Sequence, residues 1–511
     1  MSSLTRTKIF MILFLIMVVS FTISYFHIPI TFFNGIFIAS CFAMILFIKD
    51  ITQTKHSILK NFPFIGRARA ICEEEGPKTR QYFSEFDTQG TPYDREHRSD
   101  IYQKAKMDPN TSPFGTQLNV YENGYEYFKH SIYPINPHEI VEPRITIGSK
   151  DCKQPYNASI FNISAMSFGA LSNRAIMSLN GGAKLGNFFH NTGEGSLSPH
   201  HLAEGGDICF QIGTGYFGSG ITIDGVRYFD GGIFKKNAIL PQVKMIEIKL
   251  SQGAKPGHGG ILPAKKNTPE IAEIRNVEAG TEVVSPPYHT KFSTPEGLLQ
   301  FIVELRRLSE GKPIGIKLCV GDIWEFSKLA SLMNQKNVYP DFITVDGGEG
   351  GTGAAPLTFT NYVGSPLIDA LINVDSVLKK YGLRKNIKII ASGKASNAFD
   401  ILKLIALGAD AVNAARAFML SLGCIQAREC DKDTCPIGIA TQNPELAKGI
   451  NPALKKVRVY NYHREVITEV KELLGAAGLR GTNEITPDRF ERRINGSLLS
   501  YDKIIPKVIK G

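Results

Sequence analysis

The chain has 511 residues, a formal net charge of +10 and 43% hydrophobic residues, a composition typical of a globular protein rather than a disordered one. Its basic residues are scattered, apart from small groups such as Lys265 and Lys266, so we expect no nucleic-acid binding. A solvated basic surface is the simplest interpretation, followed by attraction to an anionic membrane face or to acidic partners.

Two apolar runs open the chain, from Ile9 to Phe26 and from Ile30 to Ile48. They contain 18 and 19 residues, close to the length that crosses a bilayer as a helix. A cleaved signal peptide is the competing interpretation, but its apolar core would be shorter and followed by a small-residue cleavage site. Basic residues flank both outer ends, so the positive-inside rule places these ends in the cytoplasm. Residues 1–55 are therefore predicted to anchor the protein in the inner membrane, with its body facing the cytoplasm.

The next segment, residues 56–150, is polar and aromatic and contains turn signals such as GTPYDREHR and MDPNTSPFG. It has little long periodicity. We expect it to wrap around the core that follows.

From residue 151 onward, short β-branched runs alternate with helix-length amphipathic segments, which is the pattern of a parallel sheet with crossover helices. The strand-like runs are 160–164, 187–191, 208–212, 245–250, 314–320, 342–346, 387–392 and 411–415. Eight such units predict an α/β fold, a (β/α)8 TIM barrel over residues 151–480, followed by a tail at 481–511. The chemistry of such a barrel lies at the carboxyl ends of its strands.

Glycine-rich segments follow several of these strands. The loops after strands seven and eight contain Ser392-Gly393-Lys394 and Ala415-Arg416, and residues 347–353 lie one strand earlier. Glycine-rich turns and helix starts expose backbone amides that bind anions, and these loops often hold a phosphate in barrels. Tight turns explain most single glycine clusters, but three in adjacent loops favour a phosphorylated cofactor.

Lysines end strands four and five. Lys249 and Lys317 alternate with apolar neighbours, so each is expected to point into the barrel mouth. A buried unpaired ammonium is costly, so each lysine requires an anionic ligand or a carboxylate, for which Glu194 and Glu247 are the candidates. Further cations over the same face are Lys255 and Arg275, although the helical surroundings of the arginine also suit a solvated residue.

Three of the eight cysteines lie within CIQARECDKDTC, at Cys424, Cys430 and Cys435. A zinc site would normally provide CxxC pairs and a fourth ligand, and the next histidine is His463. Three thiolates fit a three-iron cluster, and Pro436 is a familiar companion of cluster ligands. Without other motifs, three closely spaced cysteines could equally be structural thiols or a chance cluster. The other five are isolated, as expected for reduced buried thiols in a reducing compartment.

Several motifs together resemble the glutamate synthase family. The iron-sulfur segment of that family resembles GCIQARECDKDTCPIGIATQ in this chain. The motifs of its FMN-binding synthase barrel resemble, in the same order, NTGEG, IKLSQGAKPGHGG, SPPYHTKFST, GGEGGTGA and LGADAVNAARAFML. The likeness extends from about residue 61 to residue 493. Within the family the chain is most similar to the short, single-chain FMN-binding type, here with a membrane hairpin in front.

The resemblance implies FMN in the barrel mouth and a 3Fe-4S cluster on Cys424, Cys430 and Cys435. The residues implied near the isoalloxazine ring are Ala165, Met166, Ser167, Gln211 and Lys317. Those implied around the ribityl phosphate are Gly350, Gly351, Thr352, Gly393, Lys394, Ala415 and Arg416. Those implied to hold the carboxylates of 2-oxoglutarate are Lys249, Lys255 and Arg275, with Glu194 as an acidic residue near the site.

The activity implied by the resemblance is reductive amination of 2-oxoglutarate to L-glutamate. Ammonia and the oxoacid would give 2-iminoglutarate, which takes hydride from N5 of reduced FMN. The cluster would pass single electrons from ferredoxin or from a separate NADPH-oxidising subunit. No GxGxxG motif opens a Rossmann unit in the sequence, which disfavours direct use of a nicotinamide.

Two departures from the family pattern keep alternatives open. Ile261 stands where the family commonly has a glutamine and His258 where it has an acid, so the identity of the oxoacid is open. The chain starts Met-Ser-Ser rather than with the cysteine nucleophile of an amidotransferase domain, so ammonia is expected from solution or a partner. The alternatives are an FMN-dependent oxidoreductase of another 2-oxo or 2-hydroxy acid, an N-methylglutamate synthase subunit, and a membrane-tethered electron-transfer module.

Overall fold

The computed structural model describes residues 3–25, 30–54 and 57–505. The chain divides into two compact units, Met1–Arg95 and Glu96–Gly511.

The first unit begins with two helices, α1 (Ser3–Tyr25) and α2 (Ile30–Thr52). They pack along each other, with ring centroids 6.2 Å apart for Phe10 and Phe47 and 5.6 Å apart for Phe21 and Phe37. Within the described residues, one helical stretch is long and apolar enough to cross a membrane, 34–52, with a mean hydropathy of 1.9. The apolar stretch 10–23 in α1 is shorter. Both apolar runs are therefore helical, and one of them reaches membrane-spanning length and hydropathy.

A buried carboxylate joins α2 to the helices that follow, α3 (Ser57–Asn61) and α4 (Ile65–Phe83). Asp50 is 1% exposed and accepts hydrogen bonds from the Phe64 amide at 3.3 Å and from Arg67 Nε at 3.0 Å. The 19-residue helix α4 was not expected from the sequence. Most of its side chains from residue 71 to residue 83 are exposed, so it lacks the apolar stripe by which a helix is recognised.

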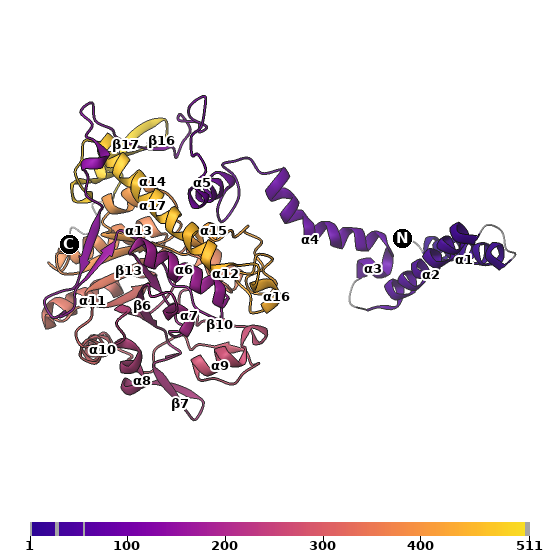
Figure 1. Cartoon of the computed structure of the whole chain (residues 1–511), viewed down its shortest axis with the longest axis horizontal. Helices are drawn as coiled ribbons and strands as arrows, with labels where there is room; N and C mark the ends of the chain where they lie inside the picture. The colour runs from indigo at the N-terminus through magenta and orange to yellow at the C-terminus, as the bar shows by residue number, and fades with distance from the viewer. Residues whose placement is uncertain (1–2, 26–29, 55–56, 506–511) are drawn as a thin grey trace. The chain divides into compact units, whose positions relative to one another are not determined.

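The second unit contains a closed barrel of eight parallel strands (Figure 1). They are β4 (Phe161–Ile163), β5 (Phe189–Asn191), β6 (Asp207–Ile212), β9 (Val243–Lys249), β12 (Ile314–Leu318), β13 (Phe342–Asp346), β14 (Lys388–Ser392) and β15 (Ala411–Ala414). The order around the barrel is the order in the chain, and pairing of β15 with β4 closes it. The predicted barrel and its eight strands are confirmed, with boundaries shifted by at most a few residues.

Helices surround these strands and connect them (Figure 1). The helices of this unit are α5 (Arg95–Lys106), α6 (Asn173–Gly186), α7 (Pro199–Leu202), α8 (Gly231–Ala238), α9 (Pro269–Arg275), α10 (Pro295–Leu308), α11 (Ile323–Lys336), α12 (Leu357–Tyr362), α13 (Leu367–Lys380), α14 (Ala398–Ala406), α15 (Arg416–Ser421), α16 (Pro444–Ala447), α17 (Pro452–Ala476) and α18 (Tyr501–Ile504). Several start at a side chain that accepts a hydrogen bond from the first turn, as Ser172 does from the Ala175 amide and Asp230 from the Ile233 amide. Such caps satisfy amides that a helix start leaves without a partner.

Short strands outside the barrel form small antiparallel sheets. They are β1 (Glu126–Phe128), β2 (Arg144–Ile147), β3 (Tyr156–Ser159), β7 (Gly220–Ile223), β8 (Val226–Phe229), β10 (Ile261–Leu262), β11 (Val283–Val284), β16 (Phe490–Ile494) and β17 (Ser497–Ser500). β1 pairs with β16, and β16 pairs with β17, so the tail of the chain returns to the segment before the barrel.

The β2–β3 hairpin closes the amino end of the barrel. Its buried side chains Ile147 and Tyr156 pack in one cluster with Phe189, Met245 and Phe342, which come from three barrel strands. Burial of such apolar surface contributes about 25 cal/mol per Å². Since this end is filled, the opposite end, where the strands reach their carboxyl termini, is the open one.

Replacement of Asp341 by alanine is expected to destabilise this barrel strongly. The carboxylate is fully buried and accepts hydrogen bonds from the Ser149 amide at 2.6 Å, the Ile314 amide at 2.7 Å and Arg306 Nη2 at 3.0 Å. Its loss leaves a buried guanidinium without its counter-ion, which costs about 3–5 kcal/mol. Urea unfolding of the variant measures the loss, and Asp488→Ala, at an exposed position, should stay within about 0.5 kcal/mol of the native protein.

Candidate active site at the carboxyl ends of the strands

A buried ion pair lies at the open end of the barrel. Lys249 ends β9 and Glu194 lies in the loop after β5, and Nζ and Oε1 are 2.8 Å apart. A Cβ added at Gly213 would lie 2.6 Å from the side chain of Glu194, so a glycine at this position lets the loop approach the carboxylate. The sequence offered Glu194 and Glu247 as carboxylate partners of Lys249, and in the structure Lys249 pairs with Glu194.

Two further cations act on the same carboxylate. Burial by itself would raise the pKa of Glu194, but the charges of Lys249, Lys255 and Arg275 together hold this pKa below its ordinary value. Burial lowers the pKa of Lys255 to about 8 and that of Arg275 to about 10, and the negative charge of Glu194 opposes both shifts. Three cations thus surround one carboxylate, and this excess of positive charge suits an anionic ligand.

Arg275 is the residue whose placement the sequence left open. It is 5% exposed, and its Nη2 donates to the Phe168 carbonyl at 3.1 Å. The guanidinium carbon lies 5.1 Å from the centroid of the Phe217 ring. A Cβ added at Gly195 would lie 2.7 Å from Nη2, so a larger residue there would displace the guanidinium. The arginine therefore belongs to the interior of the site and not to the solvated surface.

A small pocket opens over the ion pair. It is lined by Glu194, Lys249, Ser251, the segment 257–260 and Pro286–Pro287. His258, which stands where the family commonly has an acid, lies in this lining, and its ring packs edge-on against Phe359 with centroids 5.4 Å apart. Ile261, which stands where the family commonly has a glutamine, lies in β10 and pairs with Val284 in β11.

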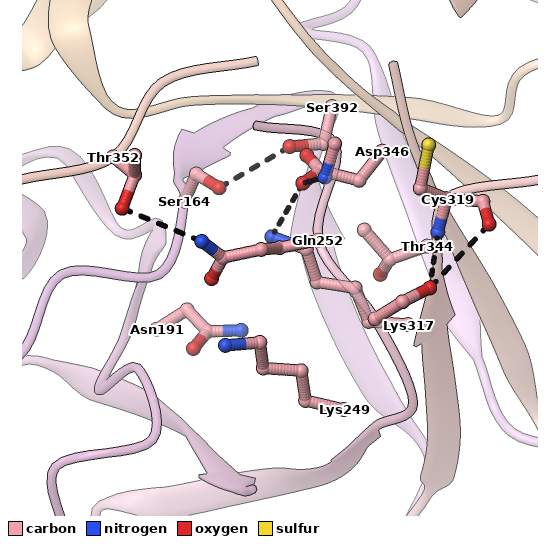
Figure 2. Close-up of polar contacts among 12 residues, drawn as sticks. Ser164, Asn191, Lys249, Gln252, Lys317, Cys319, Thr344, Asp346, Thr352 and Ser392 are labelled. Atoms are coloured by element: carbon pink, nitrogen blue, oxygen red, sulfur yellow. Dashed lines mark hydrogen bonds and ion pairs between the residues drawn. The ribbon is translucent and has the colours of Figure 1, made fainter. Parts of the chain in front are cut away.

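Lys317 has a carboxylate partner of its own. Its Nζ lies 3.5 Å from Asp346 Oδ2, an oxygen that also accepts a hydrogen bond from the Gly253 amide at 2.7 Å. Figure 2 shows Lys249, Lys317 and Ser164 around the same region at the strand ends. Ser164 Oγ lies 3.3 Å from Ser392 Oγ, across the closure of the barrel.

Glu247 is a buried residue that the sequence offered only as a possible lysine partner. It is 1% exposed, and it accepts hydrogen bonds from Asn191 Nδ2 at 2.8 Å, Gln211 Nε2 at 2.6 Å and Thr344 Oγ1 at 2.6 Å. The amide of Gln211 is thereby fixed, with its nitrogen toward the carboxylate. The alternation of Glu247 and Lys249 on one face of β9 was the signal available in the sequence.

His289 is a residue that sequence reasoning missed. Burial lowers its pKa to about 4, so the ring is neutral at physiological pH. Its Nε2 lies 2.9 Å from the Lys249 carbonyl and its Nδ1 lies 3.0 Å from the Tyr216 hydroxyl. Because a carbonyl only accepts, Nε2 carries the proton, and Nδ1 accepts from the tyrosine. His289 lies within the motif SPPYHTKFST, which was the available signal.

The loops predicted to bind phosphate contain two interacting cationic side chains, Lys394 and Arg416. Arg416 Nη2 donates to the Glu349 carbonyl at 2.8 Å, and a Cβ added at Gly351 would lie 2.6 Å from Arg416 Nε. Burial lowers the pKa of Lys394, the charge of Arg416 lowers it further, and that of Glu349 opposes both effects. Two cations close together, next to glycine backbone, fit a dianionic phosphate.

The remaining predicted cofactor residues lie in the same set of loops. Thr352 Oγ1 accepts from Gln252 Nε2 at 3.4 Å (Figure 2), and the Met166 amide donates to the Asn191 carbonyl at 3.1 Å. A Cβ added at Gly193 would lie 3.1 Å from the Ser167 amide nitrogen. The others, at the starts of loops after β4, β13, β14 and β15, are Ala165, Gly350, Gly393 and Ala415.

The cysteine segment follows α15. The Gln426 amide donates to Cys424 Sγ at 3.4 Å. Burial, with a smaller contribution from the thiols of Cys430 and Cys435, raises the pKa of Cys424 to about 12, so the three thiols interact electrostatically. Within residues 3–25, 30–54 and 57–505, no group of three or more His, Cys, Asp or Glu side chains is arranged so that it could hold a metal ion. The donor chemistry, thiols with an N–H···S hydrogen bond, fits an iron–sulfur cluster.

Lys266 corrects the expectation of a solvated basic pair at residues 265 and 266. It is 2% exposed, and its Nζ donates to the carbonyls of Ala170 at 2.7 Å, Cys430 at 3.2 Å and Ala440 at 3.2 Å. The lysine therefore ties the cysteine segment to the loop after β4.

Comparison with known proteins agrees with this arrangement. Residues 112–480 match the conserved region in glutamate synthase. The chain is 36% identical to the glutamate synthase large subunit-like protein YerD of Bacillus subtilis, over 97% of this chain and 99% of that protein. It is 37% identical to the archaeal-type NADPH glutamate synthase of a Thermotoga species, over 64% of this chain and 60% of that protein. It is also 37% identical to the archaeal NADPH glutamate synthase of Methanocaldococcus jannaschii, over 65% of this chain and 61% of that protein. The chain belongs to the glutamate synthase family and is an oxidoreductase.

Proposed function

We propose that this protein catalyses the reductive amination of 2-oxoglutarate to L-glutamate with FMN and a 3Fe-4S cluster. The observation that carries the proposal is the group of three buried cations, Lys249, Lys255 and Arg275, around the single carboxylate of Glu194. Their excess positive charge lies at the open end of the barrel and would be neutralised by a dicarboxylate.

The side chains at the strand ends have distinct proposed roles. Lys394 and Arg416, with the backbone of Gly350, Gly351 and Thr352, would hold the phosphate of FMN, and Lys317 and Gln211 would lie near its ring. FMN, when bound in its reduced form, supplies the hydride. Lys249, Lys255 and Arg275 orient the oxoacid by its carboxylates, so catalysis comes mainly from positioning. Glu194, which remains ionised, accepts hydrogen bonds from ammonia.

The iron–sulfur cluster, the electron donor and the membrane anchor complete the proposed function. Cys424, Cys430 and Cys435 would hold the cluster, which carries single electrons from ferredoxin or from an NADPH-oxidising subunit. Ammonia comes from solution or from a partner. Helices α1 and α2 would anchor the protein in the inner membrane with its body in the cytoplasm, supported by the apolar stretch 34–52.

The test is anaerobic purification in detergent, followed by addition of 2-oxoglutarate and ammonium to the reduced protein. We expect reoxidation of the flavin together with formation of glutamate. Faster turnover with methylamine than with ammonia would instead identify an N-methylglutamate synthase subunit. If another oxoacid turns over faster, His258 and Ile261 are the first positions to exchange. A flavin spectrum that 2-oxoglutarate leaves unchanged would identify an electron-transfer module.

The affinity for 2-oxoglutarate is expected to fall as the pH rises above about 8. The pKa of Lys255 lies at about 8 because the ammonium is buried, so above this pH the group of cations around Glu194 loses one positive charge. The dissociation constant, measured from the flavin spectrum of the oxidised protein without ammonia, should rise up to about tenfold per pH unit. Lys255→Arg should flatten this profile because a guanidinium keeps its charge. A native profile that is flat up to about pH 9.5 would contradict this role of Lys255.

A further inference from the structure

Three cations lie together on the second unit, and we call them the cationic patch: Lys106 at the end of α5, and Lys455 and Arg458 in the first turns of α17. Burial lowers the pKa of Lys455, and the positive charges of Arg458 and Lys106 lower it further, so the three charges interact. Lys106 Nζ forms a long ion pair with Asp108 Oδ2, at 3.9 Å.

The charge of the patch is poorly compensated. In the part of the chain that the structure describes, the ion pairs include neither Lys455 nor Arg458. Lys456, the next residue of the same helix, is paired with Glu204 at 2.8 Å. Like charges held together without counter-ions oppose folding, so they suggest a role outside the folded chain, in attracting an anionic partner.

Two exposed apolar side chains lie next to these cations in the sequence of α17. Leu454 is 66% exposed and Val457 is 44% exposed, on the same turns of α17 as Lys455 and Arg458. Exposed apolar residues flanked by charge are characteristic of protein interaction surfaces, where the apolar contacts give affinity and the charges give speed and orientation.

The patch lies next to the cysteine segment. A Cβ added at Gly423, the residue before Cys424, would lie 3.1 Å from Lys455 Nζ. From α5, the Tyr102 hydroxyl donates to the Cys424 carbonyl at 2.5 Å, and the Ala105 carbonyl accepts from Asn461 Nδ2 of α17 at 3.3 Å. The two helices that carry the patch are therefore tied to each other and to the backbone of the first cysteine.

We propose that the cationic patch, with Leu454 and Val457, is the docking site of an acidic one-electron carrier protein, an inference that rests on the proposed function. Each encounter oxidises one carrier by one electron, and two encounters supply the two electrons that one imine consumes. Repeated encounters require fast association and fast release, which small, charge-steered interfaces provide. Docking beside Cys424 keeps the transfer distance short.

The test uses the full-length protein, prepared in detergent without air, and an acidic ferredoxin as probe. Binding of the oxidised ferredoxin, which needs no turnover, is measured at low and high salt. The triple variant Lys106→Glu, Lys455→Glu, Arg458→Glu is expected to weaken binding by about tenfold or more at low salt and to remove its salt dependence. Its iron content and its glutamate synthesis driven by a small-molecule reductant should match those of the native protein.

Two further variants keep the test decisive. The matched control reverses three exposed lysines on α8 and α11, Lys235→Glu, Lys328→Glu and Lys336→Glu, and should bind ferredoxin as the native protein does. Leu454→Ser truncates a side chain that is 66% exposed, so it should fold normally even if the triple variant does not, and it should weaken binding several-fold.

Equal loss of binding in the patch and control variants would overturn the proposal in favour of a net-charge effect, and undiminished binding in both patch variants would overturn it outright. If charge reversal in the patch weakens only the attraction of nanodisc-embedded protein to phosphatidylserine vesicles, the patch is a membrane-binding face. A protein without iron that makes no glutamate refutes the proposed function and this inference together. A protein that contains iron, makes glutamate and binds ferredoxin independently of the patch refutes only the docking site.

Discussion

Cys435→Ser is expected to deprive the protein of its iron. The thiol of Cys435 is 8% exposed and lies close to Cys424 and Cys430, the other two sulfurs available to a cluster. A serine hydroxyl does not ionise at neutral pH, so one of three ligands is lost and the site cannot close around three irons. Iron per chain should fall by about tenfold or more. Flavin content should change less than iron content, because no cysteine is among the residues proposed to hold FMN.

Iron is measured in the anaerobically purified protein, alongside the electron paramagnetic resonance spectrum of its oxidised form. Cys72→Ser is the matched control, because this thiol is exposed and lies in the first unit. Full iron content in Cys435→Ser would show that the three cysteines are structural thiols and would remove the cluster from the proposed function.

Lys249→Met is expected to reduce kcat/KM for 2-oxoglutarate by roughly a thousandfold, equivalent to about 4 kcal/mol. The substitution removes a cation from the proposed substrate pocket and leaves Glu194 without the ammonium that lies 2.8 Å away. Burial then favours the protonated form of Glu194, which no longer accepts a hydrogen bond as a carboxylate. Steady-state rates with saturating ammonium measure the effect.

A second variant separates catalysis from stability. Loss of one partner of a buried pair costs about 3–5 kcal/mol of unfolding free energy, whereas removal of both charges restores much of it. The double variant Glu194→Gln, Lys249→Met should therefore unfold in urea nearly as the native protein does, yet remain as inactive as Lys249→Met. If activity returns with stability, Lys249 acts only in holding the fold.

The barrel was predictable because its signals are local. Each strand is a short β-branched run followed by a polar or glycine-rich loop, so eight strands were found without knowledge of their partners. Helix α4 was missed for a related reason, since its exposed side chains carry no apolar period. Pattern reasoning detects elements that bury one face and overlooks those that do not.

The partners of the charged residues were not predictable, because they are distant in the sequence. Lys249 and Glu194 are 55 residues apart, and Arg275 donates to a carbonyl 107 residues away. Lys266 donates to carbonyls that are 96, 164 and 174 residues away. Only the closed barrel determines which loops meet, so a lysine in a polar segment looks solvated until the fold buries it.

Pairing of β1 with β16 sets an order of events during synthesis. Glu126 of β1 accepts hydrogen bonds from Lys403 Nζ at 2.6 Å and from the Tyr501 hydroxyl, and the Phe128 ring packs at a tilt against Phe490 with ring centroids 4.8 Å apart. A ribosome must therefore add more than 360 residues after β1 before the last of these partners emerges. By then the apolar helices α1 and α2 have long left the exit tunnel, so insertion of the amino-terminal segment can precede closure of the body, and contacts of such long range form slowly.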